Sequence, residues 1–332
     1  KTLLPSSLQL RARAQLELTR RQRTGNVLTA PANWRDRLPS LFPRHFSKPF
    51  APRHGELWDW VTGIQAGARP RPFTAFWGRG GAKSTNAEAA VIDLGARGVR
   101  RYCWYVSGTQ DKADSHVENI GAMLESANVS KYYPELSRRM IGKYGNSKGW
   151  RRNRLRTASG LTVDSLGLDT GARGMKIEDA RPDIIIFDDV DELHDTLAIT
   201  TKKIQTITQS VLPSGSTDCA VMFIQNLIHP QSIASMLADG RADFLTDRIV
   251  SGPHPAVEGL VYEQKNGRFV ITGGVATWDG QSLEVCQQQI DTWGLSAFLQ
   301  ESQHDVDRAG GIWNHIEFQH EDYDKLPVFT KT

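Results

Sequence analysis

Residues 73–85 read FTAFWGRGGAKST, and this stretch decides the fold. An apolar run typical of a buried strand meets a glycine-rich turn, which is followed by Lys-Ser-Thr and then by a helix-forming segment from Ala87 to Leu94. Glycines let successive backbone N–H groups curl around an anion, and a helix N-terminus adds its partial positive charge. The order of strand, turn and helix therefore predicts a cradle for the phosphates of a nucleotide.

Residues of the turn have separate expected tasks. We expect Lys83 to reach the β- and γ-phosphates and to act in catalysis, and the Ser84 hydroxyl to bind Mg²⁺. The spacing departs from G-x-x-x-x-G-K-[ST], because Trp77 and Ala82 stand where that pattern has glycines. The alternative is a loop with an exposed lysine. The residues predicted to contact the nucleotide are Gly78, Arg79, Gly80, Gly81, Ala82, Lys83, Ser84 and Thr85.

A second motif further along the chain supplies acids. Residues 181–192 read RPDIIIFDDVDE, an apolar run that ends in a cluster of carboxylates. Such a run is typical of a strand buried on both faces of a parallel sheet, and ligands bind at the carboxyl ends of those strands. We expect Asp188 to bind Mg²⁺ and Asp189, or else Glu192, to activate the attacking water. A solvated acidic turn is the alternative, but the upstream lysine–serine motif favours an ATPase.

The remaining segments alternate between strand-like and helix-like patterns, which predicts an α/β fold with a mostly parallel sheet and helices on both faces. Strands are expected at Arg101–Ser107, Leu161–Leu166 and Cys219–Gln225, with weaker ones at Phe244–Val250 and Arg268–Thr272, and helices at His54–Ile64, Lys112–Ser126, Leu197–Val211 and Leu283–Gln303. The proline-rich segment 30–52 is expected to be irregular. We expect an N-terminal basic helical arm and connector over residues 1–50, a core over 51–250 and a small lid or linker subdomain over 251–332.

Composition limits the class of protein. The chain has 332 residues, of which 39% are hydrophobic and 23% charged, as in ordinary globular proteins. The net charge is only +3, so any contact with nucleic acid must come from a local patch. The three cysteines (Cys103, Cys219 and Cys286) are widely spaced, which favours a reducing compartment. No apolar run approaches the roughly 20 residues that a membrane helix needs, so no membrane partner is expected.

The strongest basic patch is residues 143–156, KYGNSKGWRRNRLR. Tyr144 and Trp150 are interleaved with its cations. Lysine and arginine side chains hold the phosphate backbone of DNA without reading bases. We therefore expect Arg151, Arg152 and Arg154 to contact DNA, and a solvated loop is the alternative.

Five segments, taken in order, resemble the ATPase domain of tailed-bacteriophage terminase large subunits, the motors that drive DNA into viral procapsids. They are residues 46–58 (FSKPFAPRHGELW), 79–85 (RGGAKST), 171–189 with GARG and RPDIIIFDD, 223–226 (FIQN) with His229, Pro230 and Leu237 after it, and 293–313 from Trp293-Gly294 to Gly310-Gly311-Ile312-Trp313. The resemblance covers residues 45–318, and the order and spacing of the segments carry it. It implies a P-loop ATPase of the additional-strand type.

The resemblance also implies roles for single residues. Arg79 would contact the γ-phosphate region of its own subunit's nucleotide, and Arg173 would reach the nucleotide of a neighbouring subunit in a ring. Gln225 and Asn226 would sense the γ-phosphate or the attacking water. A surface arginine and a polar strand end are the respective alternatives. Most ring ATPases of this division have Glu where Asp189 stands, so its shorter reach leaves Glu192 as a second candidate for the base.

For the whole chain, the resemblance implies an ATP-hydrolysing motor that uses Mg²⁺ and moves double-stranded DNA without sequence preference. It implies a homo-oligomeric ring that works with the phage portal and the small terminase subunit, in the host cytoplasm at the portal vertex of the procapsid. Another P-loop DNA motor (helicase-like or transposition-associated) and a nucleotide-responsive binding module are the alternatives. Terminases usually also carry a nuclease domain, but the acids near the end of this chain (Asp279, Asp291, Asp305, Asp307 and Glu317) lie in turns or helix-like segments, so no nuclease activity is expected.

Overall fold

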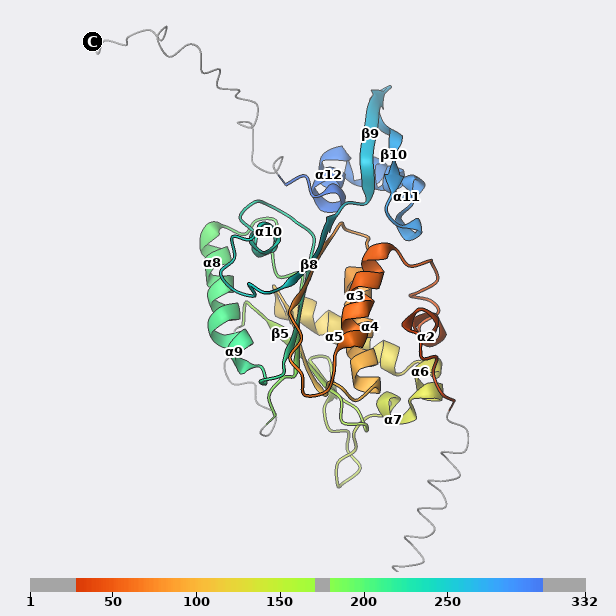
Figure 1. Ribbon diagram of the computed structural model, residues 1–332, viewed down its shortest axis with the longest axis vertical. Helices are drawn as coiled ribbons and strands as arrows, with labels where there is room; N and C mark the ends of the chain where they lie inside the picture. The colour runs from red at the N-terminus through yellow and green to blue at the C-terminus, as the bar shows by residue number, and fades with distance from the viewer. Residues whose placement is uncertain (1–27, 171–179, 307–332) are drawn as a thin grey trace, which may run out of the picture.

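A computed structural model describes residues 28–170 and 180–306 of the protein. Its centre is an eight-stranded sheet in the order β3-β4-β5-β2-β6-β7-β1-β8 (Figure 1). The strands are β1 Phe73–Trp77, β2 Tyr102–Ser107, β3 Trp150–Arg151, β4 Arg154–Arg156, β5 Thr162–Gly167, β6 Ile184–Asp188, β7 Ala220–Gln225 and β8 Ile249–His254. In the part of the sheet with the order β5-β2-β6-β7-β1-β8, neighbouring strands run parallel. Strands β3 and β4 form an antiparallel hairpin, and β4 pairs antiparallel with β5. The α/β class predicted from the sequence is confirmed.

Strand β7 lies between β1, which leads into the glycine-rich turn, and β6, which ends in the acids. This is the additional-strand arrangement that the sequence predicts. The register places Phe73 of β1 beside Met222 of β7, and Ile224 of β7 beside Asp188 of β6. Because parallel strands end at the same edge of a sheet, the turn after β1, the acids after β6 and the polar end of β7 come together.

Helices cover both faces of the sheet (Figure 1). One face carries α2 Trp34–Leu41, α3 Pro52–Gly63, α4 Lys83–Ala96, α5 Gln110–Leu124, α6 Ala127–Tyr132 and α7 Pro134–Ser137. The other carries α8 Leu197–Thr206, a π-helical turn at Ile207–Val211, α9 Leu212–Ser214 and α10 Ile233–Asp239. Strands covered on both faces bury every side chain, which is why β1, β2, β6 and β7 read as continuous apolar runs rather than alternating ones.

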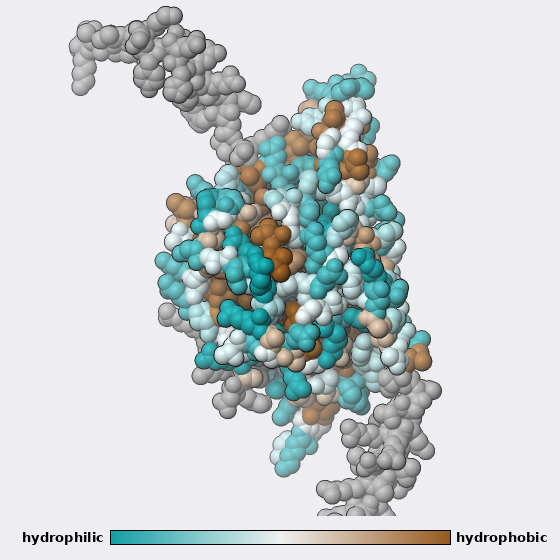
Figure 2. Space-filling view, viewed as in Figure 1, coloured by the Kyte–Doolittle hydropathy of each residue, from teal (hydrophilic) through white to brown (hydrophobic). Residues whose placement is uncertain are grey.

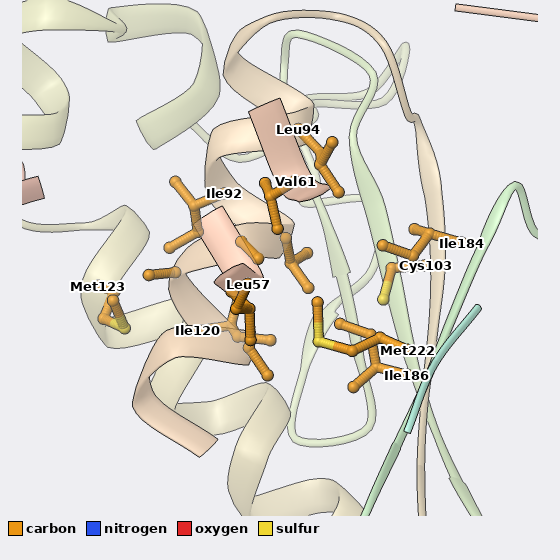
Figure 3. Packing of buried hydrophobic residues seen from close by; sticks show 14 of the residues in the cluster. Leu57, Val61, Ile92, Leu94, Cys103, Ile120, Met123, Ile184, Ile186 and Met222 are labelled. Carbon is orange, nitrogen blue, oxygen red and sulfur yellow. The ribbon is translucent and has the colours of Figure 1, made fainter. Parts of the chain in front are cut away.

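The larger core lies between the sheet and the helices α3, α4 and α5. Figure 3 shows the helix side chains Leu57 and Ile120 on the side of Ile186 and Met222 of the strands, and all four are fully buried. Most of the surface seen in Figure 2 is hydrophilic, with apolar residues in small patches. Among the described helices, none is long and apolar enough to cross a membrane.

A smaller unit follows β8 and lies above the carboxyl edge of the sheet (Figure 1). It consists of the antiparallel pair β9 Val257–Lys265 and β10 Arg268–Ala276, a 3₁₀ turn at Asp279–Gln281, and the helices α11 Leu283–Trp293 and α12 Leu295–Gln303. It has its own small core around Cys286, Ile290 and Phe298. We call this unit the lid.

Several expected boundaries are wrong. The segment expected to be irregular contains α2, which the Asn33 side chain caps and which tolerates Pro39. The helix expected over 283–303 is broken at Gly294, whose φ of 87° ends α11. Strand β8 starts at Ile249 rather than at Phe244, and strand β9 was not expected.

Candidate phosphate-binding site

The glycine-rich turn joins the end of β1 to the start of α4, as the sequence predicts. Gly80 and Ala82 adopt left-handed backbone conformations, with φ of 88° and 62°, which bend the chain sharply over a few residues. Helix α4 begins at Lys83 without a side-chain cap. Since the first N–H groups of a helix have no partner within it, these amides are available to an anion.

Lys83 lies folded against the turn. Its Nζ donates to the carbonyl oxygens of Trp77 (2.9 Å) and Gly78 (3.4 Å), and the residue is buried. Burial lowers the pKa of Lys83, and the charges of Asp189 and Asp188 oppose this. The lysine and the two adjacent acids therefore share one electrostatic environment, and the structure brings the two sequence motifs together.

Asp188 ends β6 and is fully buried. Its Oδ2 accepts a hydrogen bond from the hydroxyl of Tyr105 (2.8 Å), whereas its Oδ1 has no hydrogen-bond partner among the described residues. Burial is the main reason why the pKa of Asp188 is raised to about 6, and His116, Tyr105 and the Ser84 hydroxyl limit this rise. A buried carboxylate oxygen without a partner, next to a serine hydroxyl, fits a hard cation such as Mg²⁺.

No group of three or more His, Cys, Asp or Glu side chains within residues 28–170 and 180–306 is arranged to hold a metal ion. This agrees with the chemistry of Mg²⁺, which commonly takes one or two protein ligands together with water and substrate phosphates. A site at Ser84 and Asp188 would therefore need water and substrate phosphates to complete the shell of a Mg²⁺ ion.

The acids after Asp188 have different surroundings. Asp189 has a left-handed backbone (φ 50°), which is strained for a non-glycine residue, and its side chain borders the cavity. Asp191 is buried and accepts hydrogen bonds from the backbone N–H groups of Ile233 and Ala234 (both 2.9 Å), so it caps α10. Glu192 is half-exposed and pairs with Lys112 at 3.1 Å. Of these acids, Asp189 has the largest electrostatic influence on Lys83, whereas Glu192 is paired with a cation at the edge of the cavity.

Gln225 and Asn226, which were predicted to act together, have separate positions. Gln225 is fully buried, and its Oε1 accepts from the backbone N–H of Val190 (2.8 Å), which ties the end of β7 to the segment after β6. Asn226 borders the cavity, and its Nδ2 donates to Oε2 of Glu301 (2.9 Å). Of the two, Asn226 is the one placed to contact a ligand directly.

A cavity of about 770 Å³ lies among these groups. The predicted residues that line it are Arg79, Gly80, Ala82, Lys83, Ser84, Thr85, Asp189, Glu192 and Asn226. The cavity is also lined by four residues for which the sequence predicted no role: His45, Lys112, Trp278 and Glu301. The last two belong to the lid, so residues distant in sequence complete the site. No local pattern in the sequence could have identified them.

The lid contacts the turn directly through α12. The N–H of Arg79 donates to the carbonyl of Glu301 (2.8 Å), and the Arg79 guanidinium lies 3.2 Å from the Glu301 carboxylate. A Cβ atom added at Gly78 would lie 2.4 Å from the carbonyl oxygen of Ser302, so only glycine fits there. Arg79 is 62% exposed at the cavity, which leaves it free to reorient toward a ligand. Arg173 lies outside the described residues.

Residues 150–156 of the basic patch form the β3–β4 hairpin, whereas residues 143–149 before it are a mostly exposed loop. Two of the three predicted DNA contacts are paired within the protein. Arg154 makes a two-point contact with the buried Asp164 (2.6 and 2.9 Å). Arg152 pairs with Asp111 (3.2 Å) and Glu118 (3.3 Å). Arg151 is exposed.

Comparison with known proteins gives the following. No family model and no curated protein matches the chain. Among solved structures, the large terminase ATPase domain of Thermus phage P74-26 is 16% identical with a TM-score of 0.36, covering 57% of this chain and 68% of that one. The Phi-28 gp11 DNA packaging motor is 11% identical with a TM-score of 0.31, covering 60% and 75%. Proteins of the class that the sequence resembles are therefore found among the structures similar to this chain, at values too low to assign its function.

Proposed function

We propose that this chain is an ATP-hydrolysing motor that moves double-stranded DNA, and that it serves as the ATPase of a phage terminase large subunit. One observation carries the proposal: Lys83 and Ser84 at the start of α4 line one cavity together with Asp189, and the buried Asp188 at the end of β6 interacts electrostatically with Lys83 and Ser84. A lysine, a hydroxyl and an acid in this relation are the groups that P-loop enzymes use for Mg²⁺ and a triphosphate.

The magnesium ion, when bound, neutralises charge on the β- and γ-phosphates. Ser84 and Oδ1 of Asp188 would hold it. The residues of the chain have three further tasks. The N–H groups at the start of α4 bind phosphate oxygens, and Lys83 exchanges its two carbonyl partners for the β- and γ-phosphates. Asp189 orients and deprotonates the attacking water, with Glu192 as the second candidate for this base.

The remaining cavity residues supply charge and sensing. Arg79, exposed at the cavity, stabilises the charge that develops on the γ-phosphate. Asn226 senses the γ-phosphate, and Gln225 supports it by fixing the segment after β6 to the end of β7. Arg173 acts on the nucleotide of a neighbouring subunit, which makes a homo-oligomeric ring the active form.

The proposed DNA contact is the outer part of the basic patch, residues 143–151. No Asp or Glu lies between Leu136 and Val163. Arg152 and Arg154 are occupied by acids of the protein, whereas Lys143, Lys148 and Arg151 are exposed on the segment that projects from the lower end of the molecule (Figure 1). These cations fit contacts with DNA phosphates that do not read sequence. The portal and the small terminase subunit are the proposed partners, in the host cytoplasm at the procapsid, and this polypeptide has no nuclease activity.

The test is ATP turnover with and without plasmid DNA. Wild type should hydrolyse ATP in a Mg²⁺-dependent reaction that DNA stimulates. Lys83→Ala should lose turnover, since lysine is the group that binds the phosphates. Arg241→Ala, which removes an exposed cation paired with Asp239 far from the cavity, is the matched control and should keep it. Equal turnover by wild type and Lys83→Ala would overturn the assignment, and turnover that DNA does not alter would leave an ATPase but remove the motor.

A further inference from the structure

Behind the proposed magnesium site lies a buried set of polar side chains that the proposed reaction does not use. His116 of α5 stands between Glu88 of α4 and Asp188 of β6. The Nδ1 atom of His116 is 2.8 Å from Oε1 of Glu88, and its Nε2 atom is 3.5 Å from Oδ2 of Asp188. The ring of His116 also stacks on that of Tyr105, with centroids 4.7 Å apart.

The two ring nitrogens of His116 therefore each face a carboxylate. The contact of Nδ1 with Glu88 at 2.8 Å fixes the orientation of the ring, so that Nε2 faces Oδ2 of Asp188 at 3.5 Å. Asn119 donates a second hydrogen bond to Glu88 (3.1 Å), which fixes the position of the Glu88 carboxylate.

This chain of contacts joins the two halves of the site. Glu88 lies four residues after Ser84 on α4, which places both on one side of that helix. From Glu88 the contacts run through His116 to Asp188, so the helix that begins with Lys83 is tied to the strand that ends in the acid. On Asp188, Tyr105 and His116 both contact Oδ2, and Oδ1 is left without a partner.

We propose that His116, anchored by Glu88, is a positioning residue of the magnesium site. It holds Oδ2 of Asp188 so that Oδ1 is presented to the cation at a fixed distance from the Ser84 hydroxyl. The proposal rests on the proposed function, because it assigns His116 a task toward the metal of that site. Hydrogen-bond partners of metal ligands orient those ligands, and their loss commonly weakens metal binding about 10- to 100-fold.

A binding experiment without turnover tests this. The affinity for ATPγS is measured by calorimetry in Mg²⁺ and in EDTA, and Mn²⁺ binding to the ATPγS complex is measured by electron paramagnetic resonance. In His116→Gln we expect the Mn²⁺ affinity to fall about tenfold. The affinity for ATPγS in EDTA should stay at the wild-type value, because Lys83 and the turn are unchanged. Glu88→Gln keeps the size of the side chain and should lower the Mn²⁺ affinity by less, again without changing the affinity for ATPγS in EDTA.

Val117→Ala, on the same helix and fully buried, is the matched control for general loss of packing. It should lower the melting temperature without changing the Mn²⁺ affinity. Equal losses of ATPγS affinity in Mg²⁺ and in EDTA, or an unchanged Mn²⁺ affinity in both His116→Gln and Glu88→Gln, would overturn the positioning role. A wild type that bound no ATPγS under either condition would instead refute the proposed function.

Discussion

Replacing Asp188 by asparagine should abolish ATP turnover and at the same time stabilise the ligand-free protein. Asp188 is fully buried, and burial raises its pKa from 3.8 to about 6. A carboxyl group with a raised pKa in the folded state opposes folding at neutral pH, because the folded protein must hold a charge that the unfolded chain holds more easily. Asparagine has nearly the same shape and carries no charge, so it removes this penalty.

The magnitude follows from the pKa of Asp188. At about 1.4 kcal/mol per pKa unit, the rise from 3.8 to about 6 corresponds to about 3 kcal/mol of destabilisation at pH 7.5. The loss of stability caused by the Asp188 charge is absent below pH 3.8, grows as the pH rises to about 6, and is constant above that value. This value already includes the opposing charge of His116, which lies 3.5 Å away. Asparagine places an amide N–H group without a partner in the buried site, so the net gain should be smaller, about 1 to 3 kcal/mol.

Thermal unfolding in EDTA, without nucleotide, measures this gain. We expect the melting temperature of Asp188→Asn to exceed that of wild type at pH 7.5 by several degrees, on the scale of about 2 to 4 °C per kcal/mol for a chain of this size. The difference should shrink as the pH falls below 6, where wild-type Asp188 takes up a proton. Asp243→Asn, an acid outside the cavity lining and the buried core, is the control and should change the melting temperature little. Loss of turnover together with an unchanged or lower melting temperature would show that the buried charge of Asp188 does not destabilise the ligand-free protein.

Two further predictions concern the lid and the hairpin. Glu301→Gln should raise the affinity for ATP about 1.4- to fivefold, because the γ-phosphate must compete with the ion pair of Glu301 and Arg79, and an exposed ion pair is worth about 0.2 to 1 kcal/mol. Calorimetry measures this affinity, and an unchanged or weaker affinity contradicts the prediction. The double substitution of Lys143 and Lys148 by alanine should lessen the slope of log affinity for DNA against log salt by about 1 to 2, whereas Arg152→Ala, which removes a cation already paired with acids, should leave the slope near that of wild type. An unchanged slope in the double variant would show that Lys143 and Lys148 do not contact DNA.

The sequence was sufficient for the centre of the fold. Strands β1, β6 and β7 are continuous apolar runs because both of their faces are covered, and this pattern is visible without a structure. The turn from Gly78 to Ala82 was recognisable for a similar reason, because few residues other than glycine tolerate its backbone conformations.

The lid was harder to predict. Strand β9 has mostly exposed or half-exposed side chains, since it pairs with β10 alone, and so it lacks an apolar pattern. Helix α2 carries an internal proline, Pro39, which sequence rules read as a break, but tertiary packing of Trp34 and Leu38 outweighs it.

The parts of the site that were missed depend on contacts between distant residues. Glu301 reaches Asn226 across 75 positions of the chain, and His116 reaches Asp188 only because α5 packs against β2, the neighbour of β6 in the sheet. The same holds for the basic hairpin. A run of cations predicts a contact with DNA, but Arg154 is occupied by Asp164, which becomes its neighbour only once β4 pairs with β5.

The most direct test of the central claim is a crystal structure with ATPγS and Mn²⁺, in which anomalous scattering locates the metal. We expect a metal peak beside the Ser84 hydroxyl and Oδ1 of Asp188. We also expect Lys83 Nζ to have moved from the carbonyl oxygens of Trp77 and Gly78 to phosphate oxygens. A nucleotide bound elsewhere, or a metal peak away from Asp188 with Lys83 still on those carbonyls, would contradict the central claim.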